Sequence, residues 1–240
     1  MTSPATPAPT RPIEQTFDAY DVTYTNVVQD SVAFSGLAYD YFLRSKANLL
    51  AELIAEQLPH QPAPKVLDVG CGVGALHPLL KPLCGELSGA DISETCIEQA
   101  RRQNPGVDYR TYQGGRLPYE DGQFDLVVTV CVMHHVPPAQ WAAFVAEMKR
   151  VARPGGLVCV IEHNPINPMT RLSVMRCPFD EDAVLLSSGK VRRLLANAGL
   201  AACASRYFVF VPSTRPWALW AERRLARLPL GAQYVAFARA

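Results

Sequence analysis

The chain has 240 residues, of which 49% are hydrophobic and 19% charged, and its formal net charge is +1 at pH 7. This length suits one α/β domain with a large core and is short for two full domains. The small net charge predicts no general attraction to nucleic acid or to an acidic membrane, and the chain has neither a membrane-spanning apolar run nor a signal-peptide core.

The seven cysteines form no C-x-x-C pair and no metal-ligand spacing. Their odd number in predicted strands and helices indicates reduced thiols in a cytoplasmic protein. We therefore expect no bound metal and no disulfide framework.

The N-terminal part of the chain divides into a tail and a helical segment. Residues 1–12 are rich in proline and too polar to bury a core, so we expect a disordered tail before a single domain at 13–240. Within that domain, 13–58 begins with scattered aromatic residues and continues with apolar residues at helical spacing from Tyr39 to Leu58.

A short apolar run followed by glycines is the most informative stretch. Val66 to Val69 predicts a buried parallel strand, Gly70, Gly72 and Gly74 turn the chain, and Ala75 begins a helix. Glycine lets a ligand touch the backbone, and a helix N-terminus attracts an anionic group. The spacing also fits a dinucleotide fingerprint, so the glycines alone do not select a cofactor.

Two acids favour one cofactor. Asp68, before the glycines, would oppose a pyrophosphate but suits the ammonium group at the amino-acid end of S-adenosylmethionine, unless it only caps the loop. Asp91 ends a second strand, Glu86 to Ala90, about 20 residues further on, where an acid holds ribose hydroxyls. The alternative role of Asp91 as a helix cap is weakened because Ser93 already precedes the helix Glu94 to Gln103.

The middle of the chain predicts three more strands and a helix. They are Val107–Tyr112, the nearly continuous apolar run Phe124–Val130, the helix Ala139–Arg150 and, after a reversal at Arg153–Gly156, the strand Leu157–Ile161.

Four motifs in chain order make the chain resemble the class I S-adenosylmethionine-dependent methyltransferases over about residues 65–162. The matching motifs are Val66-Leu67-Asp68-Val69-Gly70-Cys71-Gly72-Val73-Gly74, Gly89-Ala90-Asp91-Ile92-Ser93, Leu117-Pro118 with Phe124-Asp125-Leu126-Val127-Val128, and Val151-Ala152-Arg153-Pro154-Gly155-Gly156.

The resemblance implies a fold and a cofactor site. The fold is an α/β, seven-stranded Rossmann-like sheet of order 3-2-1-4-5-7-6 with helices on both faces. The loop after the third strand lacks the acid that many relatives use for adenine, which leaves backbone groups of Gly115 and Arg116, or else Gln113, for that role. The residues expected at S-adenosylmethionine are Asp68, Gly70, Cys71, Gly72, Gly74, Asp91, Ile92, Gly115, Arg116, Val130, Cys131 and, in an N-terminal cap, Tyr20, unless Tyr20 only anchors the cap.

Candidate proton-handling residues follow the fourth and fifth strands. His134 and His135 come after Val130, and Glu162 and His163 come after Ile161, where side chains of an open sheet reach the ligand crevice. We expect His163 to act as a base, with Glu162 orienting it or acting itself, and His134 as the alternative. These residues could instead only brace the loops.

The C-terminal third predicts a lid and a hairpin. Residues 166–186 form an insertion expected to cover the acceptor, followed by a helix from Ser187 or Ser188 to Gly199. Within 201–240 we expect strands at Tyr207–Val211 and Gln233–Ala238. The helix between them, Arg215–Leu228, should pack its tryptophans on the core, or else meet lipid or a second copy.

The sequence predicts methyl transfer from S-adenosylmethionine to a small molecule. Oxygen is preferred as the acceptor atom because His134, His135 and His163 should converge near the methyl group. Nitrogen or sulfur acceptors, an NAD-binding oxidoreductase and a non-catalytic cofactor-binding scaffold are the alternatives. We expect no nucleic-acid partner and no stable membrane insertion, and both a monomer and a homodimer remain open.

Overall fold

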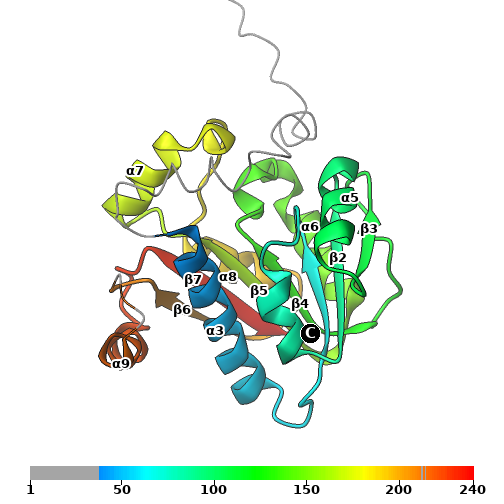
Figure 1. The fold of residues 1–240 in the computed structure, drawn as a ribbon, viewed down its shortest axis with the longest axis horizontal. Coiled ribbons are helices and arrows are strands. Elements are labelled where there is room, and N and C mark those ends of the chain that lie inside the picture. Colours follow the sequence, from blue (N-terminus) through cyan, green and yellow to red (C-terminus); the bar gives the residue numbers. More distant parts are fainter. Residues whose placement is uncertain (1–37, 212, 214) are drawn as a thin grey trace, which may run out of the picture.

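The computed structural model describes residues 38–211, 213 and 215–240, and their centre is a seven-stranded sheet of order β3-β2-β1-β4-β5-β7-β6 (Figure 1). This confirms the predicted order. The strands are β1 (Lys65–Val69), β2 (Glu86–Asp91), β3 (Asp108–Thr111), β4 (Phe124–Val130), β5 (Ala152–His163), β6 (Ala201–Phe208) and β7 (Gln233–Arg239).

The strand directions bring the sequence motifs to one edge of the sheet. β1 pairs in parallel with β2 and β4, and β4 pairs in parallel with β5, so the carboxyl ends of these strands lie together. β7 runs antiparallel between β5 and β6. A dinucleotide-binding sheet has the order 3-2-1-4-5-6 instead, so the inserted antiparallel strand distinguishes the two folds.

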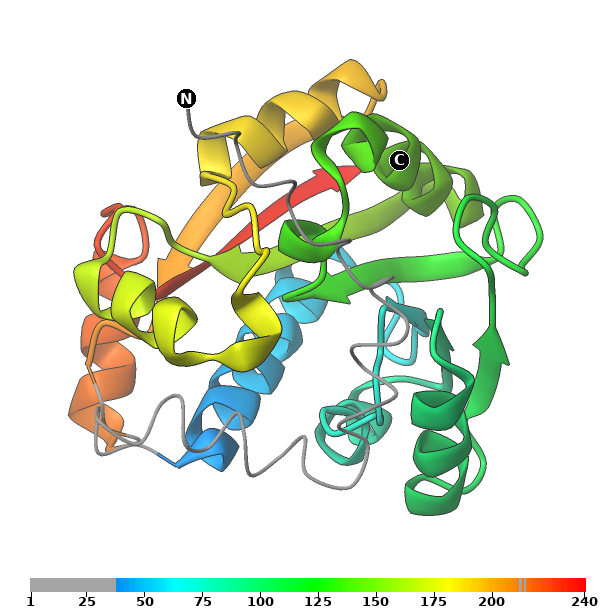
Figure 2. The same cartoon turned by 90° about the horizontal axis from the view of Figure 1, so that it is seen from above.

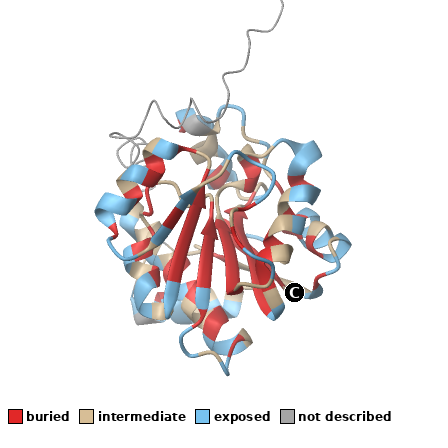
Figure 3. Ribbon diagram, turned by 90° about the vertical axis from the view of Figure 1, so that its right-hand side faces the viewer, coloured by how far each residue is buried: buried red, intermediate tan, exposed pale blue. Residues whose placement is uncertain are grey.

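Helices cover both faces because the central strands are apolar on both sides (Figures 2 and 3). Leu67 and Val69 face the core under α6 (Trp141–Val151) and α8 (Ser188–Asn197), whereas Val66 faces the core under α3 (Tyr39–Gln57). The helices are α3 (Tyr39–Gln57), α4 (His77–Leu80), α5 (Glu94–Gln103), α6 (Trp141–Val151), α7 (Pro168–Arg176), α8 (Ser188–Asn197) and α9 (Pro216–Leu225), and the short 3-10 turns are η2 (Lys81–Leu83), η3 (Met133–His135), η4 (Pro138–Gln140) and η5 (Pro178–Asp180).

Local signals predicted several boundaries well. α5 has the predicted bounds, and the Ser93 hydroxyl accepts a hydrogen bond from the Cys96 N–H as its cap. α8 begins after Ser187, whose side chain accepts from the Lys190 N–H. The predicted N-terminal cap at 13–37 and the tail at 1–12 lie outside the described residues.

Two strand predictions were wrong at their ends. β5 starts at Ala152 and includes Arg153–Gly156, which we expected to form a chain reversal. Its register shifts beside Phe124, and Gly155 has a φ of +77°, so an irregular strand replaces the predicted turn. β6 spans Ala201–Phe208 instead of 207–211, because pairing with β7 compensates for its weak apolar pattern.

The predicted packing of the C-terminal helix was also wrong. Trp217 and Trp220 of α9 are 56% and 61% exposed, whereas Ala218 is fully buried. A small residue, and not the tryptophans, therefore faces the core. No helix in the described part of the chain is both long and apolar enough to cross a membrane.

Candidate active site

A cavity of about 950 Å³ lies over the carboxyl ends of the central strands. Its lining runs from the glycine turn after β1 to the histidines after β4 and β5, and α7 contributes part of the wall. This is the position at which an open α/β sheet binds its ligands.

The glycine turn has one position set by packing and one that faces open space. A Cβ on Gly70 (φ +78°) would lie 2.5 Å from Val132 Cγ2, so a side chain there would collide with the loop after β4. Gly72 (φ +52°) lines the cavity, and a Cβ there would meet nothing within 4 Å. Space for a ligand against the backbone therefore exists at Gly72.

Asp91 holds this turn from β2. Its Oδ2 accepts a hydrogen bond from the Gly72 N–H at 2.7 Å, and its Oδ1 accepts from the Ser93 N–H at 3.0 Å. Burial raises the pKa of this carboxyl group, while the backbone N–H groups oppose the rise. Asp91 and Ile92 both line the cavity, so a carboxylate with spare acceptor sites is available to a ligand.

Asp68 is a buried carboxylate of which one oxygen is hydrogen-bonded. Its Oδ2 lies 3.2 Å from His77 Nε2, and His77 Nδ1 lies 2.5 Å from the Tyr109 hydroxyl. Its Oδ1 is buried without a hydrogen-bond partner among the described residues, although Asp68 lines the cavity. His77 could not be found from the sequence, because neither its spacing nor its neighbours distinguish it.

The loop after β3 closes another side of the cavity. Tyr112, Gly115 and Leu117 line it, whereas the Arg116 side chain lies 3.6 Å from Asp121 and is 73% exposed. α6 fixes this loop: Glu147 accepts from the Leu117 N–H, and Arg150 donates to the carbonyl oxygens of Leu117 and Tyr119.

Cys131 lies at the end of β4 in a left-handed conformation, with a φ of +57°. Its N–H donates to the Ile161 carbonyl, and its Sγ lies 3.6 Å from Lys46 Nζ of α3. Burial acts to raise the pKa of the thiol, but Lys46 and His163 outweigh burial and lower that pKa to about 7. Sequence reasoning missed Lys46, since it belongs to a helix that otherwise shows only a core pattern.

Glu162 organises the turn after β4 and lies behind the cavity wall. It is fully buried, and its Oε1 accepts from the N–H groups of Val132 and His134. Its Oε2 lies 2.6 Å from His134 Nδ1. Burial alone would raise the pKa of Glu162, but His134 outweighs burial and lowers it. Glu162 therefore positions His134 and not, as we expected, His163.

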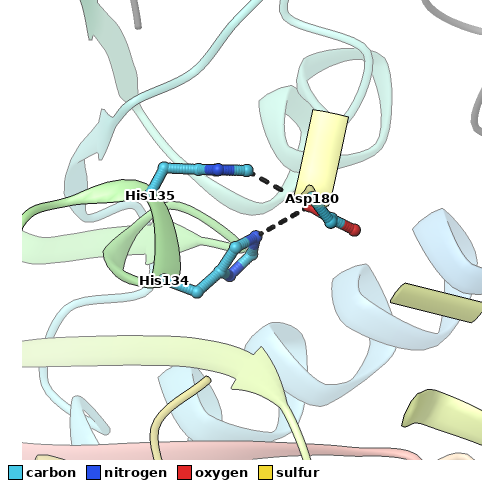
Figure 4. Close-up of side chains that lie close together, drawn as sticks. All are labelled: His134, His135 and Asp180. Carbon is cyan, nitrogen blue, oxygen red and sulfur yellow. Dashed lines mark ion pairs between the residues drawn. The ribbon is translucent and has the colours of Figure 1, made fainter. Parts of the chain in front are cut away.

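His134, His135 and Asp180 converge beside this turn (Figure 4). Asp180 Oδ1 lies 3.3 Å from His134 Nε2 and 3.4 Å from His135 Nε2. Burial acts to lower the pKa of His134, yet Glu162 and Asp180 raise it well above its usual value. Burial and then His134 lower the pKa of His135 to about 4. Sequence reasoning assigned Asp180 no role, because a distant 3-10 turn brings it to the histidines.

His163 also lines the cavity, and its ring centroid is 5.2 Å from that of His134. Burial would lower its pKa, but interaction with Cys131 outweighs burial and raises it.

Gly74 lies outside the cavity lining and packs against Tyr109 and Asn104. The lining includes most of the predicted site residues, namely Asp68, Gly70, Cys71, Gly72, Asp91, Ile92, Gly115, Val130, Cys131, His134 and His163. Tyr20 lies outside the described residues.

Comparisons with known proteins agree with this fold. A family model described as a methyltransferase domain matches residues 67–160. Residues 67–160 of this chain therefore form a methyltransferase domain, and its sheet order is that of the class I S-adenosylmethionine-dependent methyltransferases. A probable S-adenosylmethionine-dependent methyltransferase from Mycolicibacterium smegmatis is 32% identical over 62% of this chain and 56% of its own length.

Two further relatives extend the comparison of the methyltransferase domain. A ubiquinone biosynthesis O-methyltransferase from Chelativorans sp. is 28% identical over 64% of this chain and 65% of its own length. A solved structure from Thermotoga maritima, a possible histamine N-methyltransferase, has a TM-score of 0.64 and 19% identity, over 95% of this chain and 99% of that one. The chain spans between half and two thirds of the lengths of the first three curated relatives that it matches, at 55%, 56% and 65%.

The residues of this methyltransferase domain fit S-adenosylmethionine, the cofactor of the family. The unpartnered Asp68 oxygen matches an ammonium group, and the open space beside Gly72 admits a ligand at the backbone. A pyrophosphate would meet Asp68 unfavourably, as the sequence indicated.

Proposed function

We propose that this protein transfers a methyl group from S-adenosylmethionine to an oxygen atom of a small molecule. The observation that carries the proposal is the continuous cavity of about 950 Å³ from the glycine turn to the histidines. This volume is at the upper end of ligand pockets, which range over roughly 300–1,000 Å³, and leaves space for an acceptor beside the cofactor.

The cofactor end of the cavity would bind through residues of β1, β2 and the following loops. Asp68 would pair with the ammonium group, Asp91 would accept hydrogen bonds from the ribose hydroxyls, and Ile92 with Gly115 would contact the base. Backbone groups of Val130 and Cys131 would face the methionine part. The bound cofactor supplies an activated methyl group on a sulfonium sulfur, so the protein mainly has to align the acceptor with it.

The acceptor end lies between the histidines and α7. Met169, Thr170 and Asp180 line the cavity together with His163, so residues 166–186 would act as the acceptor lid. We assign the role of proton acceptor for the hydroxyl to His163, because it reaches the cavity and both ring nitrogens of His134 already have carboxylate partners.

The choice of oxygen is supported by the acceptor end and by a relative. Imidazole groups at this end can accept a hydroxyl proton, which an alcohol or phenol must lose on methylation. The relative from Chelativorans sp. is named as an O-methyltransferase of ubiquinone biosynthesis. The Thermotoga maritima structure is named for nitrogen methylation, but its 19% identity supports the fold alone.

Calorimetric titration with S-adenosylhomocysteine and NADH tests the cofactor part of the proposal. We expect equimolar binding of S-adenosylhomocysteine and no measurable heat with NADH. Binding of NADH in place of S-adenosylhomocysteine would refute a methyltransferase function.

His163→Gln tests the proton acceptor in a methyl-transfer assay. We expect kcat to fall by about 10²–10⁴-fold, the contribution typical of a general base, while S-adenosylhomocysteine affinity stays unchanged. A raised acceptor KM with unchanged kcat would instead indicate that His163 only positions the acceptor.

A further inference from the structure

The side chains of His134, His135 and Asp180 form a cluster to which the proposed methyl transfer assigns no chemical step. His134 and His135 belong to η3 after β4, and Asp180 ends η5, so two separate turns of the chain bring them together (Figure 4). Their ligand atoms all lie within 4.8 Å of one another. All three residues line the cavity.

We propose that His134, His135 and Asp180 bind a divalent transition-metal ion, with zinc as the representative case. A four-coordinate zinc site has bonds of about 2.1 Å, which places neighbouring ligand atoms about 3.4 Å apart. Asp180 Oδ1 is 3.3 Å from His134 Nε2 and 3.4 Å from His135 Nε2, so both of these separations match that geometry. Two imidazoles with one carboxylate suit such an ion better than magnesium or calcium, which prefer oxygen ligands.

The residues around the cluster support a metal site. Glu162, fully buried, binds His134 Nδ1 at 2.6 Å and leaves Nε2 directed at Asp180. A carboxylate on the second nitrogen of a metal-binding histidine fixes the ring and strengthens it as a ligand. The Val184 N–H donates to the His134 carbonyl at 2.8 Å, which ties the segment after Asp180 to the histidine turn.

The position of the cluster assigns the ion a role at the acceptor. Three protein ligands leave an open coordination position, as in catalytic zinc sites. Because the side chains of His135 and Asp180 are 12% and 10% exposed on the cavity, that position would face the acceptor. A hydroxyl oxygen bound there would be held near the methyl group and would lose its proton more readily. This role rests on the proposed function, whereas metal binding itself does not.

Metal titration of the full-length protein tests the site. After treatment with EDTA, the protein is titrated with Co²⁺, a spectroscopic substitute for zinc, and with Zn²⁺ in competition. We expect one equivalent of Co²⁺ to give visible absorption bands that Zn²⁺ removes. His135→Gln and Asp180→Asn should each weaken Co²⁺ binding at least tenfold, whereas His60→Gln, at an exposed histidine distant in the sequence, should leave it unchanged.

S-adenosylhomocysteine titration of the same samples separates the two proposals. Binding of S-adenosylhomocysteine without an equivalent of Co²⁺ would overturn the metal site and leave the proposed function standing. Unchanged Co²⁺ affinity in His135→Gln and Asp180→Asn would also overturn it, because the ion would then bind elsewhere. Co²⁺ binding with the expected losses but without S-adenosylhomocysteine binding would support the metal site and contradict the proposed function.

Discussion

Gly72 is the residue at which the backbone offers most room to a ligand. Its φ is +52°, and a Cβ at this position, on the cavity lining, would have no atom within 4 Å. Gly72→Val should therefore fold with a loss of about 1–3 kcal/mol in the free energy of unfolding and lose S-adenosylhomocysteine binding by calorimetry.

Gly155 provides the matched control for Gly72. It also has a positive φ, of +77°, with nothing within 4 Å of a Cβ, and it lies outside the cavity lining. Gly155→Val should have a comparable backbone cost and leave S-adenosylhomocysteine affinity unchanged. Normal binding by folded Gly72→Val would show that the glycine turn does not face the cofactor.

Asp91 has a structural role as well as its proposed ligand role. Because it accepts hydrogen bonds from the N–H groups of Gly72 and Ser93, Asp91→Ala would also disturb the turn. Asp91→Asn keeps the size of the side chain and one of its two accepting oxygens, so it disturbs the turn less, and it should weaken S-adenosylhomocysteine by about 1.5–3 kcal/mol, the scale of hydrogen bonds to a charged group.

A control substitution at Asp125 distinguishes the structural role of Asp91 from its proposed ligand role. It is a buried acid that accepts from the Lys65 N–H at 2.7 Å, outside the cavity lining. Asp125→Asn should lower stability without changing S-adenosylhomocysteine affinity. If Asp91→Asn behaves in the same way, Asp91 only caps the turn.

At the residue scale, the sequence predicted the groups that belong to local motifs. Gly72 and Asp91 follow strands directly, so strand order was enough to place them at one edge. Lys46 and Asp180 could not be predicted, because their partners Cys131 and His134 are distant in the sequence. His77 lies only nine residues after Asp68, but no motif marks it.

At the element scale, α6 clamps the loop that borders the cavity. Glu147 binds Arg150 and the Leu117 N–H, and the hydrogen bond from Arg150 lowers the pKa of Glu147 below its usual value. A lowered pKa in the folded state means that ionised Glu147 stabilises the fold above the unfolded pKa of about 4.3 and loses this effect as pH falls through the folded pKa.

Glu147→Gln tests this clamp by denaturation at several pH values. The variant should lose about 1 kcal/mol at pH 7, and its difference from the wild type should shrink as pH falls below about 4. Glu98→Gln on α5, whose side chain is 58% exposed, should change little. A difference that stays constant down to pH 3 would contradict the assignment.

Tryptophan substitutions test whether the exposed side chains of α9 contribute to the stability of the core. Trp217 is 56% exposed, whereas Trp141 is 7% exposed and donates from Nε1 to the Met133 and Val136 carbonyls. Trp217→Ser should change the free energy of unfolding by less than about 0.5 kcal/mol, and Trp141→Ala should lower it by about 3–5 kcal/mol. A loss above about 2 kcal/mol for Trp217→Ser would mean that this side chain packs on the core after all.

Element boundaries followed the sequence where caps or continuous apolar runs mark them. β4 matches its prediction, Phe124–Val130, because both of its faces are buried. The helical spacing of the tryptophans in α9 predicted the helix but not its buried side, since tertiary contacts determine which face of a short helix meets the core. The early start of β6 likewise depends on pairing with β7.

At the scale of the whole molecule, the sheet order and the cavity belong together. β7 between β5 and β6 distinguishes the methyltransferase fold, and the parallel strands bring the cofactor and acceptor ends of the cavity to one edge. Four motifs in chain order were sufficient to predict this architecture. The proposed acceptor end could not be predicted, because α7 and η5, which line this part of the cavity, have no family motif in the sequence.

Methyl transfer from S-adenosylmethionine labelled with ¹³C in its methyl group tests the central claim most directly. The protein is incubated with a metabolite extract, and the products are examined by ¹³C NMR, which distinguishes methyl groups on oxygen, nitrogen and sulfur. We predict a new oxygen-bound methyl signal that is absent with Gly72→Val. A nitrogen- or sulfur-bound signal in its place, or no transfer by protein that binds S-adenosylhomocysteine, would contradict the claim.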